Sequence, residues 1–283
     1  MCRRVNFFPL LAALLVGLMG ACGHAPEKPV NLRLSQAIEL EQKGQQAYRQ
    51  GHAAAAAGHF EAALRVDMSI ENHDGIVADR LNLAQALDAS GDVGGARRQL
   101  DALLSDSPLS LSPEQIARAK AALGLMALKQ GELADAQRLI DEAQQACAKT
   151  CPSAAAILNI NARIALERNN PSAALASAGA ALPLLAEGSH LGERANSLRI
   201  IGLARLALGE AVAALAPLLQ ALALDRELGL PERIADDLLQ LGRTHAATGN
   251  TGNAEYFYRR ALTVAEASGN AALAQRVREA NKP

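Results

Sequence analysis

Two cysteines four residues apart, Cys147 and Cys151, are the residues of this sequence whose type and spacing point most directly to chemistry. One helical turn between them would place their Cα atoms roughly 6 Å apart, within the range of a disulfide. The alternative is a pair of free thiols. A metal site would need further ligands, and no histidine lies within 25 residues of the pair. We therefore predict a disulfide that closes a short loop.

Other residues that could do chemistry are isolated. His52 and His59 lie seven residues apart, on similar faces of an expected helix, but no carboxylate or cysteine partner recurs beside them. The glycine-rich stretch 91–95 could cradle a phosphate, yet it falls on a repeated turn. The sequence has no phosphate-binding loop, zinc-protease motif, calcium loop or nucleophile elbow. We expect no catalytic activity, no metal, no cofactor and no small-molecule substrate.

The composition favours many thin, closely packed helices. Half of the 283 residues are hydrophobic, yet only 2% are aromatic and none is tryptophan. Much of the apolar content is alanine and leucine, which are strong helix formers. The formal net charge of −1 gives no general attraction to nucleic acids or anionic lipids. Aromatic platforms for stacking on bases are also scarce, so we expect no nucleic-acid partner.

The first 21 residues form a separate unit. Arg3 and Arg4 precede an apolar run over residues 7–19, which is typical of an export signal and too short for a membrane span. The tetrapeptide 19–22, Met-Gly-Ala-Cys, resembles the lipobox of bacterial lipoproteins, although that family prefers leucine where Met19 stands. The resemblance implies that Cys22 becomes the first mature residue and carries a diacylglycerol and an N-acyl chain such as palmitate. An ordinary secretory signal, cut near Ala21, is the alternative.

The residues after the cysteine indicate where the chain would reside. Gly23 stands where inner-membrane retention signals usually have aspartate. We therefore expect an outer-membrane lipoprotein facing the periplasm, with the inner membrane as the less favoured location. Residues 22–33 are polar and contain prolines, as suits a tether. More than one acyl chain gives stable anchoring, so contact with the membrane would be through the lipid only. An exported protein also meets an oxidising compartment, which favours the disulfide.

A turn residue returns about every 40 residues along the rest of the chain. Successive steps are 40, 40, 38, 40 and 40 residues, and asparagine replaces glycine once: Gly51, Gly91, Gly131, Asn169, Gly209 and Gly249. Both residue types adopt the left-handed conformation that ends a helix. A fixed period of this length indicates a stacked array of helical hairpins, in which each hairpin buries its apolar faces against its neighbours.

The residues around each turn repeat as well. Seven residues before it stands glycine or alanine, five after it always alanine, and nine after it a bulkier residue in five of the six copies. The small residues let two helix backbones approach, and the bulky residue fills the adjoining space. The pattern resembles the tetratricopeptide repeat, clearest around Gly242, Gly249, Ala254 and Tyr258. It departs from that family's usual period of 34 and is similar to its longer-period variants.

The repeat defines the expected architecture. We predict an all-α, right-handed superhelical solenoid of six hairpins over residues 34–269. Residues 270–283 would form a helix that caps the last apolar face with a polar surface.

The resemblance also implies where a ligand would bind. In that family the first helix of each hairpin lines a concave groove, and the inward slots lie thirteen, ten and six residues before the turn. In this chain those slots hold six polar residues of interest: Gln85, Asn159, Arg163, Asn196, Arg199 and Arg243. Asparagine and glutamine can pair with a peptide backbone, and arginine can hold a carboxylate. The alternative is that these are ordinary solvated residues and that partners bind elsewhere.

Together these features predict a non-catalytic scaffold or adaptor that binds a protein or peptide at the bacterial envelope. Two alternatives remain open. One is a pilotin-like assembly factor for the secretin of a type IV pilus or secretion system, and the other is a regulator of cell-wall enzymes.

Overall fold

The computed structural model describes residues 31–105, 110–147, 151–185, 188 and 190–282. The expected signal peptide, Cys22 and nearly all of the tether lie outside the described residues. In the described part the regular structure is helical throughout, with no strand. The α-helices are α1 (Leu32–Arg49), α2 (Ala53–Ser69), α3 (His73–Ser90), α4 (Val93–Ser105), α5 (Pro113–Lys129), α6 (Leu133–Cys147), α7 (Ala154–Glu167), α8 (Pro171–Ala181), α9 (Leu191–Ala207), α10 (Ala211–Glu227), α11 (Pro231–Ala247), α12 (Thr251–Ala267) and α13 (Ala271–Ala280). A short 3-10 turn, η1 (Leu182–Leu184), follows α8.

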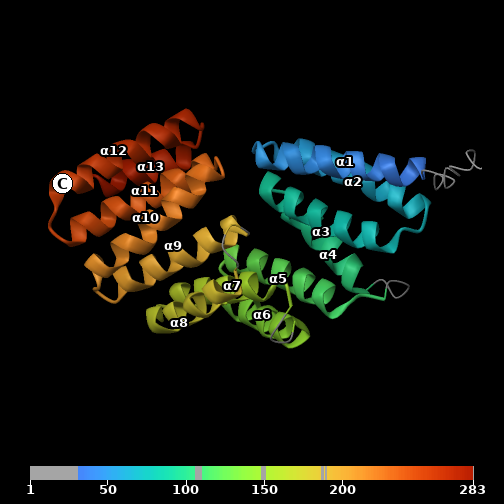
Figure 1. The fold of residues 1–283 in the computed structure, drawn as a ribbon, viewed down its shortest axis with the longest axis horizontal. Helices are drawn as coiled ribbons and strands as arrows, with labels where there is room; N and C mark the ends of the chain where they lie inside the picture. The colour runs from blue at the N-terminus through green and yellow to red at the C-terminus, as the bar shows by residue number, and fades with distance from the viewer. Residues whose placement is uncertain (1–30, 106–109, 148–150, 186–187, 189, 283) are drawn as a thin grey trace, which may run out of the picture.

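Each helix packs against the next one along the chain. Every odd-numbered helix before α13 contacts the even-numbered helix after it, and that helix contacts the following odd-numbered one. Odd-numbered neighbours such as α5 and α7, or α7 and α9, also touch. The chain thus runs as an arc from α1, around α5 to α8, to α13 (Figure 1). The all-α repeat architecture is confirmed, while the right-handed sense stays a prediction.

The turns inside the hairpins have the predicted backbone conformation. The five turn glycines have φ between 74° and 92°, and Asn169 has φ of 55°. At Asn170, which follows, the side chain accepts a hydrogen bond from the backbone N–H of Ala173, and Pro171 begins α8. Asparagine therefore replaces glycine at a turn where the next helix also receives a side-chain cap and a proline start.

The predicted packing of small against bulky residues is also confirmed. A Cβ atom added to Gly242 would lie 2.4 Å from Cε1 of Tyr258, and one on Gly202 would lie 2.5 Å from Cγ of Leu218. Gly44 meets Phe60 in the same way. All these bulky residues are buried, so the missing Cβ lets two helices approach more closely than alanine would allow.

The last helix, α13, covers the end of the array. It packs on α12 and α11, and buries Leu273, Ala274 and Val277. The outward side chains include Arg276 and Arg278, which pair with Asp236 and Glu266. In the described ranges, no helix has both the length and the apolar character needed to cross a bilayer.

Candidate functional site

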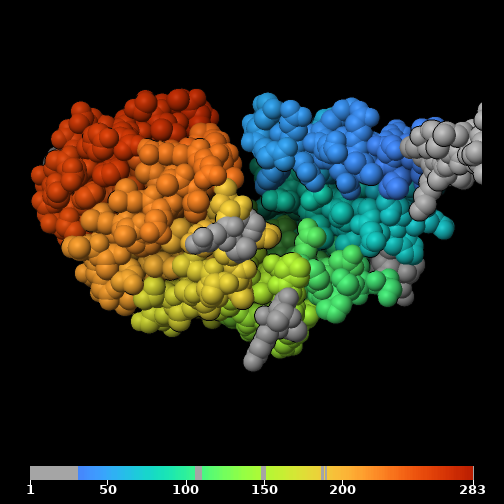
Figure 2. All heavy atoms as spheres, viewed as in Figure 1, coloured from blue at the N-terminus to red at the C-terminus, as the bar shows by residue number. Residues whose placement is uncertain are grey.

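A polar groove runs across the odd-numbered helices of the C-terminal half. Its volume is about 850 Å³, and its walls come from the end of α5, from α7, α9 and α11, and from the start of α13. Its apolar lining includes Leu166, Ile200, Leu203 and Leu273, with charged and amide side chains around them. The space-filling view shows the molecule hollowed between its N-terminal and C-terminal helices (Figure 2). The groove therefore lies on the side of the hairpins that the repeat pattern predicted.

Two guanidinium groups in this groove lack a carboxylate partner among the described residues. Arg163, on α7, forms no ion pair with a described residue. Arg233, on α11, donates a hydrogen bond to the side-chain oxygen of Asn196 and to no other described residue. Partial desolvation in the groove, then the positive charge of Arg233, lower the pKa of Arg163, and the negative charge of Glu167, which also lines the groove, partly offsets them. Nearby cations that repel one another favour the binding of an anion.

The other charged residues of the groove are mostly paired. Lys129 contacts Asp88 at 2.5 Å, and Arg276 contacts Asp236 at 3.2 Å. Glu232 accepts a hydrogen bond from the amide of Asn270. Among the described residues, the guanidinium groups of the groove without an ion pair are therefore those of Arg163 on α7 and Arg233 on α11, and the acid Glu167 lies near the first of them.

The structure brings together only part of the predicted set. Arg163, Asn196 and Arg199 line the groove, whereas Gln85 and Arg243 are exposed outside it and Asn159 is buried beneath it. Arg199 is only 7% exposed. Asn159 and Arg199 are held in contacts between repeats, so they are not presented to a ligand as the repeat pattern suggested.

Arg199 joins three helices. Its Nε donates to Oδ1 of Asp237 on α11 at 2.6 Å, and its Nη2 pairs with Asp225 on α10. Desolvation opposes its charge, but the hydrogen bond and charge of Asp237, with the charge of Asp225, outweigh it and raise the pKa of Arg199. Burial, which Arg199 only partly offsets, raises the pKa of Asp237 to about 7. The cluster fixes the junction of the last hairpins.

One repeat earlier, the same junction holds a neutral pair. Ser197 donates to Oδ1 of Asn159 at 2.8 Å, and the amide of Asn159 donates to the backbone and side chain of Glu193. Asn159 and Ser197 occupy the repeat positions of Arg199 and Asp237. Polar contact between repeats therefore recurs at this position.

The first junction holds three acids at the equivalent positions. Glu41, Asp67 and Asp79 take the places that Arg199, Asp225 and Asp237 have later in the chain. Burial, then the negative charge of Glu41, raises the pKa of Asp79 to about 9. Burial also raises the pKa of Glu41. Among the described residues, no arginine forms an ion pair with these acids.

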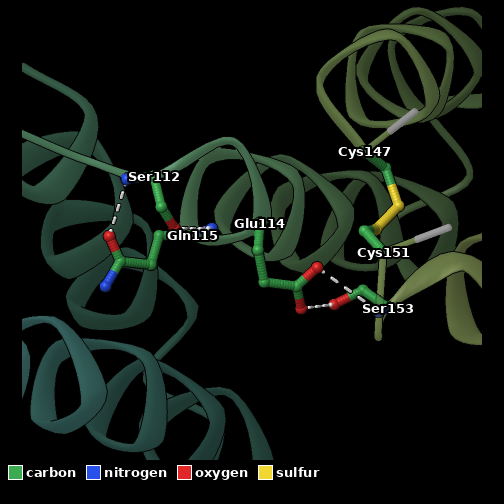
Figure 3. The surroundings of a disulfide bond; sticks show 6 residues. All are labelled: Ser112, Glu114, Gln115, Cys147, Cys151 and Ser153. Carbon is green, nitrogen blue, oxygen red and sulfur yellow. Dashed lines mark hydrogen bonds between the residues drawn. A yellow bond between two sulfur atoms is a disulfide. The ribbon is translucent and has the colours of Figure 1, made fainter.

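A disulfide joins Cys147, at the end of α6, to Cys151, with their Cα atoms 5.3 Å apart. Beside it, the carboxylate of Glu114 on α5 accepts hydrogen bonds from the hydroxyl and backbone N–H of Ser153, which immediately precedes α7 (Figure 3). The disulfide thus ties the end of α6 to Cys151, and α5 holds Ser153, just before α7, through Glu114. The bonded sulfurs are not available as metal ligands.

Comparison with known proteins rests on the fold. No protein-family model matches the chain, and no curated protein matches it in sequence. Solved structures do match. The APC/C hetero-tetramer Cut9-Hcn1 is 15% identical, with a TM-score of 0.66 over 87% of this chain and 43% of that one. TTC0263, a thermophilic TPR protein of Thermus thermophilus, is 22% identical, with a TM-score of 0.52 over 72% of this chain and 99% of that one. This is the tetratricopeptide-repeat fold.

A further match with this fold is a Rap protein complexed with Competence and Sporulation Factor. It is 16% identical, with a TM-score of 0.62 over 87% of this chain and 69% of that one. These matches agree with the resemblance that the small-residue pattern suggested, and at these identities they bear on the fold alone.

Some groove residues of the tetratricopeptide array were missed from the sequence. Arg233 lies sixteen residues before Gly249, outside the three inward slots, and Lys129 lies only two before its turn. A helix face wider than three slots would have included Arg233, because it lies three residues before the slot at Asp236 and residues three apart share a face. Arg276 belongs to the capping helix, where the repeat gives no slot.

Proposed function

We propose that this protein is a non-catalytic scaffold whose groove binds an extended segment of a partner protein that carries a carboxylate. The observation that supports this is the pair Arg163 and Arg233, two guanidinium groups from different repeats with no carboxylate partner among the described residues. A guanidinium presents paired N–H donors that match a carboxylate.

The rest of the groove suits a peptide. Its volume of about 850 Å³ exceeds that of a few side chains, and its length crosses several repeats. The side-chain N–H donors of Asn196 can pair with a peptide backbone, and Leu203 and Leu273 offer apolar contact. The Rap protein is a chain of similar fold that has been crystallised with a bound factor.

The envelope location is the second part of the proposal. Lipid attached to Cys22 would hold the array at the periplasmic face of the outer membrane, through the tether of residues 22–33. Labelling cells with a palmitate analogue should mark the wild-type protein and not Cys22→Ser. A protein that stays unlabelled and free of the membrane fraction would contradict this part.

The groove is tested with the purified protein and a library of random extended peptides. We expect selection of peptides with Asp, Glu or a free C-terminal carboxylate. In the double variant Arg163→Gln/Arg233→Gln, their affinity should fall at least about tenfold, because each charged hydrogen bond contributes about 1.5–3 kcal/mol. Arg259→Gln, an exposed arginine outside the groove, is the matched control and should bind normally. Unchanged affinity in the double variant would contradict the proposal.

The partner decides between the more specific roles. A pilotin-like assembly factor predicts loss of secretin multimers when the protein is deleted. A regulator of cell-wall enzymes predicts altered peptidoglycan with normal secretion.

A further inference from the structure

Three carboxylates from three helices meet at the junction of the first two hairpins. They belong to Glu41 on α1, Asp67 on α2 and Asp79 on α3, and one oxygen from each lies within 4.8 Å of the others. Asp79 is 0% exposed and Asp67 is 1% exposed, whereas Glu41 is partly open to solvent. The cluster is therefore sealed at its base and reachable through Glu41.

One hydrogen bond from a described residue reaches this cluster. The amide of Asn72 donates to Oδ1 of Asp67 at 2.9 Å. Both carboxylate oxygens of Asp79 are buried and accept no hydrogen bond from any described residue. A buried acceptor without a partner is costly, and a buried charge more so, unless something positive neutralises it.

The chain itself shows what neutralises such a junction. At the fifth repeat, two aspartates in the positions of Asp67 and Asp79 receive the guanidinium of Arg199, which occupies the position of Glu41. That cluster contains one positive and two negative groups. The first junction has the same two aspartates and a third acid in place of the arginine. With every carboxylate ionised, an added charge of +2 would bring it to the same net charge as the arginine-filled cluster.

We propose that Glu41, Asp67 and Asp79 bind a divalent hard cation, with Ca²⁺ as the best match, and that the ion clamps the first hairpin to the second. Three carboxylates supply up to six oxygen ligands, and hard cations such as Ca²⁺ prefer oxygen and complete their shell with water. Glu41, at the solvent edge, leaves room for that water and an entry path.

The alternative neutraliser is a proton on Asp79, shared with a neighbouring carboxylate. A cation that replaces it releases the proton to the buffer. The two explanations therefore predict different responses. If a cation neutralises the cluster, added metal stabilises the protein, and if a proton does, low pH alone stabilises it.

The test is thermal unfolding and calorimetry of the purified full chain at neutral pH, after removal of metals with a chelator that is then dialysed away. We expect Ca²⁺ at 100 times its Kd to raise Tm by roughly 5 °C or more, with one ion bound per chain. The same titration with Mg²⁺, Mn²⁺ and Zn²⁺ ranks these ions by their affinity for the site. A preference for Zn²⁺ over the oxygen-seeking ions would overturn the assignment to a hard cation.

Two variants locate the site. Glu41→Arg copies the arginine of the fifth repeat, so it should raise Tm in metal-free buffer and abolish the response to Ca²⁺. Asp79→Asn keeps the shape of the side chain and should weaken Ca²⁺ binding at least about tenfold. Asp225→Asn, at the arginine-filled junction, is the matched control and should keep the wild-type response. A folded wild type that shows neither heat nor a Tm shift with these ions would overturn the proposal, as would responses retained in both Glu41→Arg and Asp79→Asn.

Discussion

Glu41 and Arg199 occupy the same position of the repeat, ten residues before Gly51 and Gly209, and each faces two aspartates from the next two helices. One position thus carries opposite charges at two junctions with the same acidic partners. In the second and third repeats this position holds the apolar residues Leu81 and Ala121, and in the fourth it holds Asn159, which pairs with a serine. The groups at this position therefore differ from one junction to the next.

Removing the charge of Arg199 should be strongly destabilising. Arg199→Met keeps an unbranched side chain of similar reach but leaves Asp225 and Asp237 buried without a cation. Breaking a buried pair in this way costs about 3–5 kcal/mol. Urea unfolding of the purified protein measures the loss. Arg205→Ala, which removes an ion pair at the surface, should cost no more than about 1 kcal/mol. Equal losses in the two variants would show that the buried cluster has no special role.

The same cluster predicts an unusual dependence of stability on pH. The pKa of Asp237 is about 7 in the folded protein, against about 3.9 for an unfolded aspartate. Between these two values the folded state holds a proton that the unfolded state has lost. The contribution of Asp237 to the free energy of unfolding therefore falls as the pH rises from about 4 to 7, and it is constant at higher pH. Relative to Asp237→Asn, the wild type should lose up to about 2 kcal/mol between about pH 5 and 7.

The measurement is urea unfolding of both proteins at several pH values in this window. Only the difference between them matters, because it cancels the other titrating groups. A wild type that instead gains stability over Asp237→Asn as pH rises would mean that the ion pair with Arg199 lowers the pKa of Asp237, and it would contradict the prediction.

The sequence predicted the helices and turns well because their determinants are local. The turn glycines and Asn169 adopt a left-handed backbone conformation. The type of a single residue is enough to indicate this preference. The pairing of Gly242 with Tyr258 could also be anticipated, because the two residues lie sixteen apart on either side of one short turn. Such contacts repeat with the sequence period, which makes them readable without a structure.

The candidate site was harder to predict because it depends on contacts between repeats. Arg199 occupies an inward slot, but Asp225 and Asp237 turn it into a buried link, and they lie 26 and 38 residues further on. The acid cluster was missed for the same reason: Glu41, Asp67 and Asp79 are unremarkable one by one. Reading the position ten before the turn together with its two partners would have found both.

Close packing at the glycines predicts a sharp contrast between two equivalent-looking substitutions. Gly242→Ala would place a Cβ within 2.5 Å of the ring of Tyr258, so we expect a loss of about 1–3 kcal/mol. Gly58→Ala, in the exposed part of α2, meets nothing within 4 Å and should stabilise by about 0.5–1 kcal/mol through helix propensity. Thermal or urea unfolding of the two variants tests this. Similar effects in both would mean that the helices are not in contact at Gly242.

The disulfide should contribute modestly, because the loop that it closes is short. For a loop of about five residues, the loss of unfolded-state entropy stabilises the fold by about 2 kcal/mol. Reduction with dithiothreitol should lower the free energy of unfolding by no more than this, since Glu114 continues to hold Ser153 at the start of α7. The double variant Cys147→Ser/Cys151→Ser should unfold like the reduced wild type and be insensitive to the reductant. If reduction instead unfolds the whole array, the junction of α6 and α7 depends on the covalent link, and the hydrogen bonds of Glu114 are insufficient to hold it.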